Sequence, residues 1–113
     1  MSRATILTGT GRFEDRWHDY PATSQRIADV LAEIGVAARI RGTRASTLAD
    51  LDDTDILIVN SGNGRVDPEF DESDEEWEKG ARGMNLYLAS GRPAVGIHLA
   101  CDTLHTVGGW LMS

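Results

Sequence analysis

The stretch Ile56-Leu57-Ile58-Val59-Asn60-Ser61-Gly62-Asn63-Gly64 decides the fold class of this chain. Its first four residues form an unbroken apolar run, which is typical of a β-strand that is covered on both faces. The glycine-rich turn that follows ends this strand sharply. A second apolar run, Ala94-Val95-Gly96-Ile97, comes after Gly91-Arg92-Pro93, a segment that stops a helix. The two runs predict parallel strands with a helix between them.

Strand and helix patterns also alternate in the part of the chain before Ile56. Residues 4–8 predict a first strand that ends at Gly9-Thr10-Gly11. A helix capped by Thr23 or Ser24 is predicted next, ending at Gly35. Its apolar residues have the spacing i, i+3, i+4 and i+7 of one helix face: Ile27, Val30, Leu31 and Ile34.

Two further elements and one long helix complete the pattern. In residues 36–40, the side chains of Val36, Ala38 and Ile40 alternate with those of Ala37 and Arg39, which predicts a half-exposed edge strand. Leu48 to Leu51 is at most one helical turn, with Thr47 and Asp50 spaced like a capping box. Ser73 and Glu76 form a second capping box, and a stripe of side chains follows it at helical spacing: Trp77, Ala81, Met84 and Leu88. Gly80 and Gly83 lower the helix propensity of this segment.

The order of these elements predicts the architecture. Strands that alternate with helices imply a parallel sheet with right-handed crossovers, so we expect an open, flavodoxin-like or Rossmann-like sheet between two helical layers. We treat residues 1–113 as one domain. Four strands and two long helices leave apolar faces partly uncovered, and residues 107–112 are apolar, so we expect the domain to be incomplete at its C-terminal end.

Composition and charge narrow the class of protein. The chain has 113 residues, of which 41% are hydrophobic and 26% charged, the balance of a globular domain. Cys101 is the single cysteine and cannot form an internal disulfide, and no signal peptide or charge-free span is visible, so we expect a cytoplasmic protein that does not enter a membrane.

The net charge of −7 lies in one segment. Asp67 to Lys79 holds eight acids and one base, and the rest of the chain is neutral. We interpret this segment as the solvated start of a helix, where carboxylates are favourable. Nucleic acid is excluded as a partner because no basic stripe is present to contact phosphates.

Chemistry-bearing residues follow the predicted strands, at the edge where ligands bind in open α/β sheets. The three loops contain Gly9, Gly11, Trp17, His18 and Asp19 after the first strand, Asn60 to Gly64 after the third, and His98, Cys101, Asp102 and His105 after the fourth. All three histidines and the cysteine therefore fall on two of these loops.

Each of these motifs also has a structural interpretation. Gly9-Thr10-Gly11 lacks the third glycine of a dinucleotide fingerprint, because position 14 is Glu14, and no P-loop follows; we therefore predict no cofactor. Ser61-Gly62-Asn63-Gly64 is either a tight turn or an anion nest. Trp17 either covers the face of a sugar or packs in the core.

The last loop allows three interpretations. His98, Cys101 or Asp102, and His105 have helical spacing and could converge on a metal. Alternatively His98 forms a structural hydrogen bond at the strand end, and Cys101 is an inert buried thiol. The segment Gly96-Ile97-His98-Leu99-Ala100 also has the outline of a nucleophile elbow, which would raise His98 above the sheet edge as a general base or hydrogen-bond donor. Without a thiol at that position, thioester chemistry is excluded.

Four segments, taken in order, resemble the ThuA-like (trehalose-utilisation) family. They are Phe13-Glu14-Asp15-Arg16-Trp17-His18-Asp19-Tyr20, Ala22-Thr23-Ser24, Asp55-Ile56-Leu57-Ile58-Val59 and Gly91-Arg92-Pro93-Ala94-Val95-Gly96-Ile97-His98. The family has the class I glutamine amidotransferase-like fold. The resemblance covers nearly the whole chain but only the front portion of the family's domain, and it implies a link to the catabolism of disaccharides, including oxidised sugars.

The same resemblance implies roles for individual residues. Pro93 to Cys101 is similar to the segment that carries the catalytic cysteine of amidotransferases, with His98 in the cysteine's place and Ala100 in place of a glycine. Ser61-Gly62-Asn63 is similar to their oxyanion loop. The chain is thus not expected to be a glutaminase.

We therefore expect a polar cleft for a sugar or sugar derivative. His98 would act there as base or donor, with His18 and Asp19 as its partners across the cleft. The expected ligand-binding residues are Gly9, Trp17, Asn60, Gly62, Asn63, Gly64, Cys101 and Asp102. The alternative is a non-catalytic domain that binds a metabolite or a protein, or an inactive remnant. We also expect a homodimer that covers the edge strand and the apolar residues 107–112.

Overall fold

A four-stranded parallel sheet forms the middle layer of this α/β structure, a computed structural model that describes residues 2–10, 13–14, 19–62, 69 and 71–97. Its strands are β1 (Arg3–Thr8), β2 (Ala37–Gly42), β3 (Ile56–Asn60) and β4 (Ala94–Gly96). They lie in the order β2-β1-β3-β4, and every neighbouring pair is parallel. The predicted open parallel sheet is confirmed, and β2 is an edge strand as expected.

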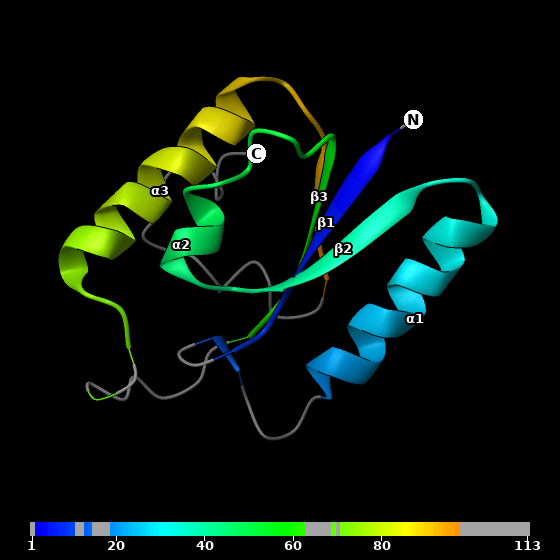
Figure 1. Ribbon diagram of the computed structural model, residues 1–113, viewed down its shortest axis with the longest axis horizontal. Helices are drawn as coiled ribbons and strands as arrows, with labels where there is room; N and C mark the ends of the chain where they lie inside the picture. Colours follow the sequence, from blue (N-terminus) through cyan, green and yellow to red (C-terminus); the bar gives the residue numbers. More distant parts are fainter. Residues whose placement is uncertain (1, 11–12, 15–18, 63–68, 70, 98–113) are drawn as a thin grey trace.

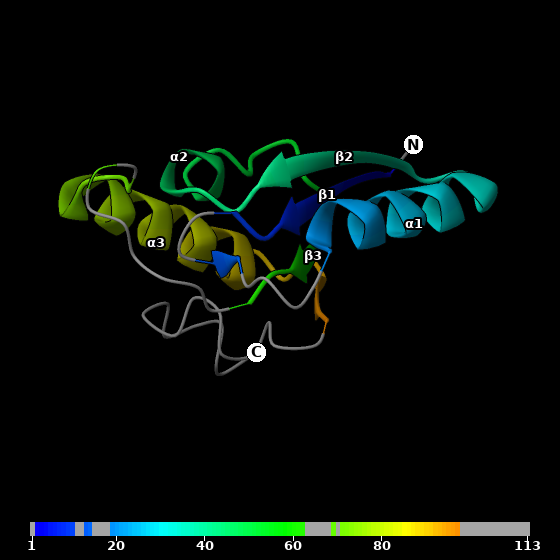
Figure 2. The ribbon, with the colours of Figure 1, turned by 90° about the horizontal axis from the view of Figure 1, so that it is seen from below.

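Helices cover both faces of the sheet. α1 (Tyr20–Glu33) lies on one side, and α2 (Ala45–Leu48) and α3 (Asp74–Ala89) lie together on the other side (Figure 1). Figure 2 shows the same three layers from below, with α1 and the α2–α3 pair at opposite sides of the strands. This is the flavodoxin-like three-layer arrangement that the alternation of strands and helices predicted.

Side chains along β1 and β3 alternate between these two helical layers. On the side of α2 and α3, one buried cluster contains Leu7, Leu48, Leu57, Val59, Met84 and Tyr87. On the side of α1, the register partners Ile6 and Ile58 are buried as well. The central strand β3 is thus covered on both faces, which explains why its apolar run is unbroken.

The long helices end where the sequence predicts, but α1 begins earlier. Ser73 and Glu76 form the predicted capping box of α3. Gly35 and Gly91 have φ values of 80° and 81°. Glycine adopts this left-handed conformation without steric strain, so each of these residues ends its helix at little cost in free energy. Asp19 caps α1 in place of Thr23 or Ser24, because its Oδ1 accepts from the Ala22 N–H at 3.1 Å.

Within the described ranges, no helix has the length and apolar character needed to cross a membrane.

The short helix α2 also differs from its prediction. It covers Ala45–Leu48 rather than Leu48 to Leu51, so Thr47 lies inside it and does not cap it with Asp50. Its first N–H groups are satisfied from a distant segment: the Glu72 carboxylate accepts from Ala45 N–H at 2.8 Å and from Ser46 N–H at 3.1 Å. A local pattern contains no sign of this contact.

The predicted apolar face of α1 is only partly buried. Val30 is 59% exposed and Ile34 is 70% exposed. At 100° per residue Val30 lies on a flank of the helix, away from the line on which Tyr20 and Ser24 contact the sheet, whereas Ile34 is the C-cap residue and lies beyond the last residue of α1. The prediction that these apolar residues all face the core is therefore wrong for Val30 and Ile34. By contrast, in α3 Met84 is buried, and Trp77, Ala81 and Leu88 pack against the core as predicted.

Candidate functional site

The candidate site lies at the carboxyl ends of β1 and β3, where the topology changes direction. The connection from β1 leads outward to β2 through α1, whereas the connection from β3 leads to β4 through α3, on the opposite face. In open α/β sheets such a switch point leaves a crevice between the two connections. The two strand ends are joined there by the Gly9 N–H, which donates to the Asn60 carbonyl at 2.9 Å.

Gly9, a predicted ligand-binding residue, has a packing role at this edge. A Cβ atom at position 9 would lie 2.5 Å from the Phe13 carbonyl oxygen and 2.8 Å from the Tyr20 ring. Only glycine fits here, because the loop after β1 folds back against the start of α1. Gly9 therefore allows Phe13 and Tyr20 to pack closely against the end of β1.

Asn60 connects the end of β3 to the opposite helical layer. Its Nδ2 donates to Ser24 Oγ at 3.0 Å and to the Tyr20 carbonyl at 3.4 Å, and Ser24 Oγ donates to Thr8 Oγ1 at 2.9 Å. The Asn60 residue is 1% exposed. Its amide thus fixes the first turn of α1 against the strand ends, and it lies below the surface that a ligand would touch.

A second hydroxyl pair fixes the loops on the other side of the switch point. The hydroxyls of Thr43 and Ser61 are 2.6 Å apart, and one of them donates to the other. The Thr8 carbonyl lies 2.9 Å from Thr43 Oγ1 and the Leu7 carbonyl lies 3.2 Å from Ser61 Oγ, so the hydroxyl that accepts within the pair can donate to its own carbonyl. Sequence reasoning missed Ser24 and Thr43. Ser24 lies on the inward line of α1 and Thr43 directly follows β2, and these positions are the signal that could have identified them.

Gly62 and Asp19 are each engaged within the chain. The Gly62 N–H, expected to contact an anion or hydroxyl, donates to the Phe13 carbonyl at 2.7 Å. The Phe13 ring in turn meets Trp77 edge to face, with ring centroids 5.4 Å apart. Asp19, expected beside His18 in catalysis, has one carboxylate oxygen on the first turn of α1. Both residues therefore hold the loops of the site in place.

The remaining predicted site residues lie outside the described residues: Trp17, His18, Asn63, Gly64, His98, Cys101 and Asp102. Among the side chains of the described ranges, every buried nitrogen or oxygen atom has a hydrogen-bond partner. The described part of the site is thus a layer of buried polar side chains whose hydrogen bonds are made within the chain. We call this layer the polar floor; it consists of Thr8, Ser24, Thr43, Asn60 and Ser61. It joins the ends of β1, β2 and β3 to the first two turns of α1.

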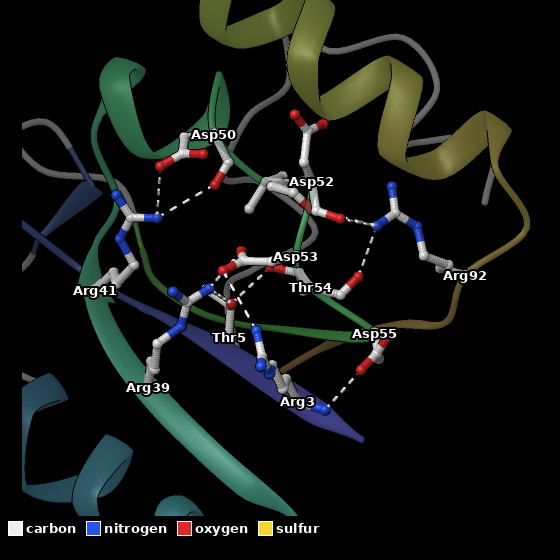
Figure 3. Close-up of polar contacts among 11 residues, drawn as sticks. Arg3, Thr5, Arg39, Arg41, Asp50, Asp52, Asp53, Thr54, Asp55 and Arg92 are labelled. Atoms are coloured by element: carbon white, nitrogen blue, oxygen red, sulfur yellow. Dashed lines mark hydrogen bonds and ion pairs between the residues drawn. The ribbon is translucent and has the colours of Figure 1, made fainter. Parts of the chain in front are cut away.

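A separate polar cluster surrounds the connection between α2 and β3. Arginines from three other segments converge on this connection in Figure 3. Arg39 Nη2 lies 2.7 Å from Asp53 Oδ1, and Arg41 Nη1 lies 3.5 Å from Asp50 Oδ2. The hydrogen bond from Arg39 lowers the pKa of the Asp53 carboxyl below its ordinary value. Because these charges are mutually compensated and Arg92 donates only to main-chain carbonyls and Ser90, we assign the cluster a structural role.

Comparisons of the chain with protein families and with curated proteins find no match. The functional assignment therefore depends on the fold and on the edge of the sheet described above.

Proposed function

We propose that this chain is a ThuA-like domain that binds a sugar or sugar derivative at the carboxyl ends of β1 and β3. His98 would be the central polar group, with His18 and Asp19 across from it. A cytoplasmic location and a role in disaccharide catabolism belong to the same proposal. It is supported by the fold and by the motifs that resemble the family, each of which is short.

One observation carries the proposal: the described neighbours of both histidines form hydrogen bonds with the last two residues of β3, Val59 and Asn60. The Tyr20 carbonyl, two residues after His18, accepts from Asn60 Nδ2 at 3.4 Å. Ile97, directly before His98, donates its N–H to the carbonyl of Val59 at 3.0 Å. Two segments far apart in the sequence, each of which adjoins one of the histidines, are thus bonded to the same end of β3. This convergence supports a shared site for His18 and His98.

The chemistry of such a pair suits a polyhydroxylated molecule. A neutral imidazole accepts a proton from a sugar hydroxyl, and an imidazolium donates one, so His98 would serve as base or donor near neutral pH. A carboxylate beside the second histidine would favour its charged form. Glutaminase chemistry is not proposed, because the elbow position holds an imidazole rather than a thiolate.

A second candidate function is a non-catalytic binding domain or an inactive remnant. It is favoured by the internal engagement of Gly9, Asp19, Asn60 and Gly62, which all have partners within the chain. Both candidates predict a ligand or partner at the same edge, but only the first requires the histidines.

The test is an NMR titration of the ¹⁵N-labelled chain with trehalose at millimolar concentration, with glycerol as the control polyol. We expect trehalose to shift the amide signals of Gly9, Asn60 and Gly62, and we expect His98→Ala and His18→Ala to abolish the shifts. His105→Ala is the matched control. Shifts that persist in both variants would favour the non-catalytic domain. Shifts confined to other surfaces, or equal shifts with glycerol, would overturn the sugar site.

A further inference from the structure

The two edges of the sheet differ in charge. β2 carries Arg39 and Arg41, which are paired with Asp53 and Asp50 of the same chain. β4 has no charged residue, and Val95 at its centre is 50% exposed. Charged side chains on an edge strand are a common device against pairing with another chain. In the described part of the sheet, β2 has this protection and β4 does not.

The main chain of β4 presents hydrogen-bonding groups outward. Leu57 N–H donates to the Pro93 carbonyl and Ile97 N–H donates to the Val59 carbonyl, each at 3.0 Å, so Pro93 and Ile97 turn these groups toward β3. N–H and C=O groups alternate sides along a strand, so those of Ala94 and Gly96 point away from β3. β4 is the last strand of the described sheet, so no strand lies beside these groups.

We propose that β4 pairs with β4 of a second copy of this chain, antiparallel and about a two-fold axis at Val95. Ala94 of each copy would exchange hydrogen bonds with Gly96 of the other. The two Val95 side chains would then face each other as a non-hydrogen-bonded pair, with Cα atoms about 4.5 Å apart. Both half-exposed valines would lose contact with water in this pairing.

Symmetry and charge favour a second copy as the occupant of this edge. Pairing of β4 with β4 is isologous and closes after two copies, whereas pairing of β4 with β2 would be open-ended and would bring Arg39 and Arg41 to the contact. The acidic residues Asp74, Glu75 and Glu76 lie in the first turn of α3, and β4 is reached from the last turn. Arg92, just before β4, is turned toward its own chain, where it donates to the Thr54 carbonyl at 2.7 Å. The two-fold axis therefore brings no like charges of these residues together.

The contact is small, so the dimer should be weak. Three residues of edge strand bury far less than the roughly 1,600 Å² of a standard stable interface, which places the dimer in the transient class. We expect a reversible monomer–dimer equilibrium in sedimentation experiments between about 1 µM and about 1 mM. This proposal does not depend on the proposed sugar site.

The test compares charges placed on the two edges. Val95→Lys should give a monomer over the whole concentration range, because it opposes two ammonium groups across the axis. Ile40→Lys is the matched control, since Ile40 is on the other edge strand and is 37% exposed; this variant should dimerise like the wild type. A wild type that remains monomeric, a Val95→Lys dimer, or open-ended polymers would each overturn the proposal. A Val95→Lys dimer would instead place the contact elsewhere, for example at residues 107–112.

Cross-linking gives a second measurement, which does not require the fold to tolerate a lysine at position 95. In a Cys101→Ser background, Val95→Cys should form an intermolecular disulfide with oxidised glutathione, because the expected Cα separation lies within the range that disulfides span. Ile40→Cys in the same background should remain monomeric under the same conditions. Equal cross-linking of the two variants would contradict pairing through β4.

Discussion

Arg92 joins the α2–β3 connection to the end of α3, and its partners among the described residues include no acidic side chain. Its Nη1 lies within hydrogen-bond distance of three main-chain oxygens: those of Leu51 at 3.3 Å, Asp52 at 3.2 Å and Thr54 at 2.7 Å. Its Nε donates to Ser90 Oγ at 2.8 Å, and its guanidinium carbon lies 4.4 Å from the centre of the Tyr87 ring. The sequence shows Arg92 only as part of a segment that stops a helix.

Replacing Arg92 should therefore destabilise the fold even when the positive charge is kept. We expect Arg92→Lys to lower the free energy of unfolding by about 1–2 kcal/mol, because an ammonium cannot reproduce the planar set of donors or the stacking on Tyr87. Urea denaturation measures this, and Arg82→Lys on the exposed face of α3 is the control. Equal midpoints for the two variants would contradict the role assigned to Arg92.

Asp53 makes the stability of the fold depend on pH. The Arg39 hydrogen bond holds the pKa of Asp53 below the ordinary value of 3.8 in the folded chain. A lowered folded pKa contributes stability above the unfolded value, and this stability is lost as the pH falls from that value through the folded pKa. We expect Asp53→Asn to reduce the loss of melting temperature between pH 5 and pH 3, about the range over which an ordinary carboxyl titrates. Asp52→Asn is the neighbouring control, and an unchanged pH profile in Asp53→Asn would exclude this contribution.

At the level of elements, α2 and α3 cross at two glycines. A Cβ atom at Gly80 would lie 2.9 Å from the Ala45 carbonyl oxygen, and one at Gly83 would overlap the carbonyl oxygen of Leu48. The sequence interpretation saw these glycines only as a loss of helix propensity. In the structure they allow the two helix backbones to approach.

Gly83→Ala should therefore destabilise the protein although alanine is the better helix former. The gain in propensity is about 1 kcal/mol, and overpacking against a backbone atom costs about 1–3 kcal/mol, so we expect a net loss. Thermal unfolding measures it, with Glu78→Ala on the same helix as the control. A raised melting temperature in Gly83→Ala would show that α2 moves aside freely.

The elements that the sequence predicted correctly carry their signals locally. The apolar run of β3, the capping box of α3 and the glycine after α1 are each contained in a few neighbouring residues. The predictions that are wrong concern elements whose bounds are determined by contacts with residues far away in the sequence. α2 begins at Ala45 because Glu72, 27 residues further on, binds its first N–H groups. No pattern within Thr47 to Leu51 could show this.

Over the whole molecule, α1 is held against the sheet most closely at its N-terminal end. Its buried residues are Tyr20 and Ser24, both in the first two turns, while Val30 in the second half and the C-cap residue Ile34 are exposed. Regions with few buried apolar contacts open at low free energy. The amides of the second half of α1 should therefore exchange with deuterium before those of β1 and β3.

Ser24 should control this opening. Ser24→Ala removes the partner of both Thr8 and Asn60, which should cost about 1–3 kcal/mol and accelerate exchange along α1. Gln25→Ala, at the exposed neighbouring position, is the control. Exchange followed by mass spectrometry tests both expectations, and uniform protection across α1, β1 and β3 would contradict them.

The open parallel sheet between helical layers could be predicted, because alternating strands and helices leave few arrangements open. The hydrogen bonds of the polar floor could not be predicted. Thr43, Ser24 and Asn60 come from three separate segments, and each is an ordinary polar residue until the fold brings them together. The same holds for Gly62, because its N–H donates to the carbonyl of Phe13, a residue 49 positions earlier in the chain.

The central place of β1 has a consequence for how the chain is made. β1 pairs with β2 through residue 42 on one side, and with β3 through residue 60 on the other. A ribosome adds about 5–20 residues per second, so the second side of β1 stays open for about one to four seconds after the first can close. During that interval an apolar strand with one bare edge is exposed to the nascent chains of neighbouring ribosomes. We therefore expect slower translation across residues 43–60 to lower the share of newly made chain that reaches its native pairing.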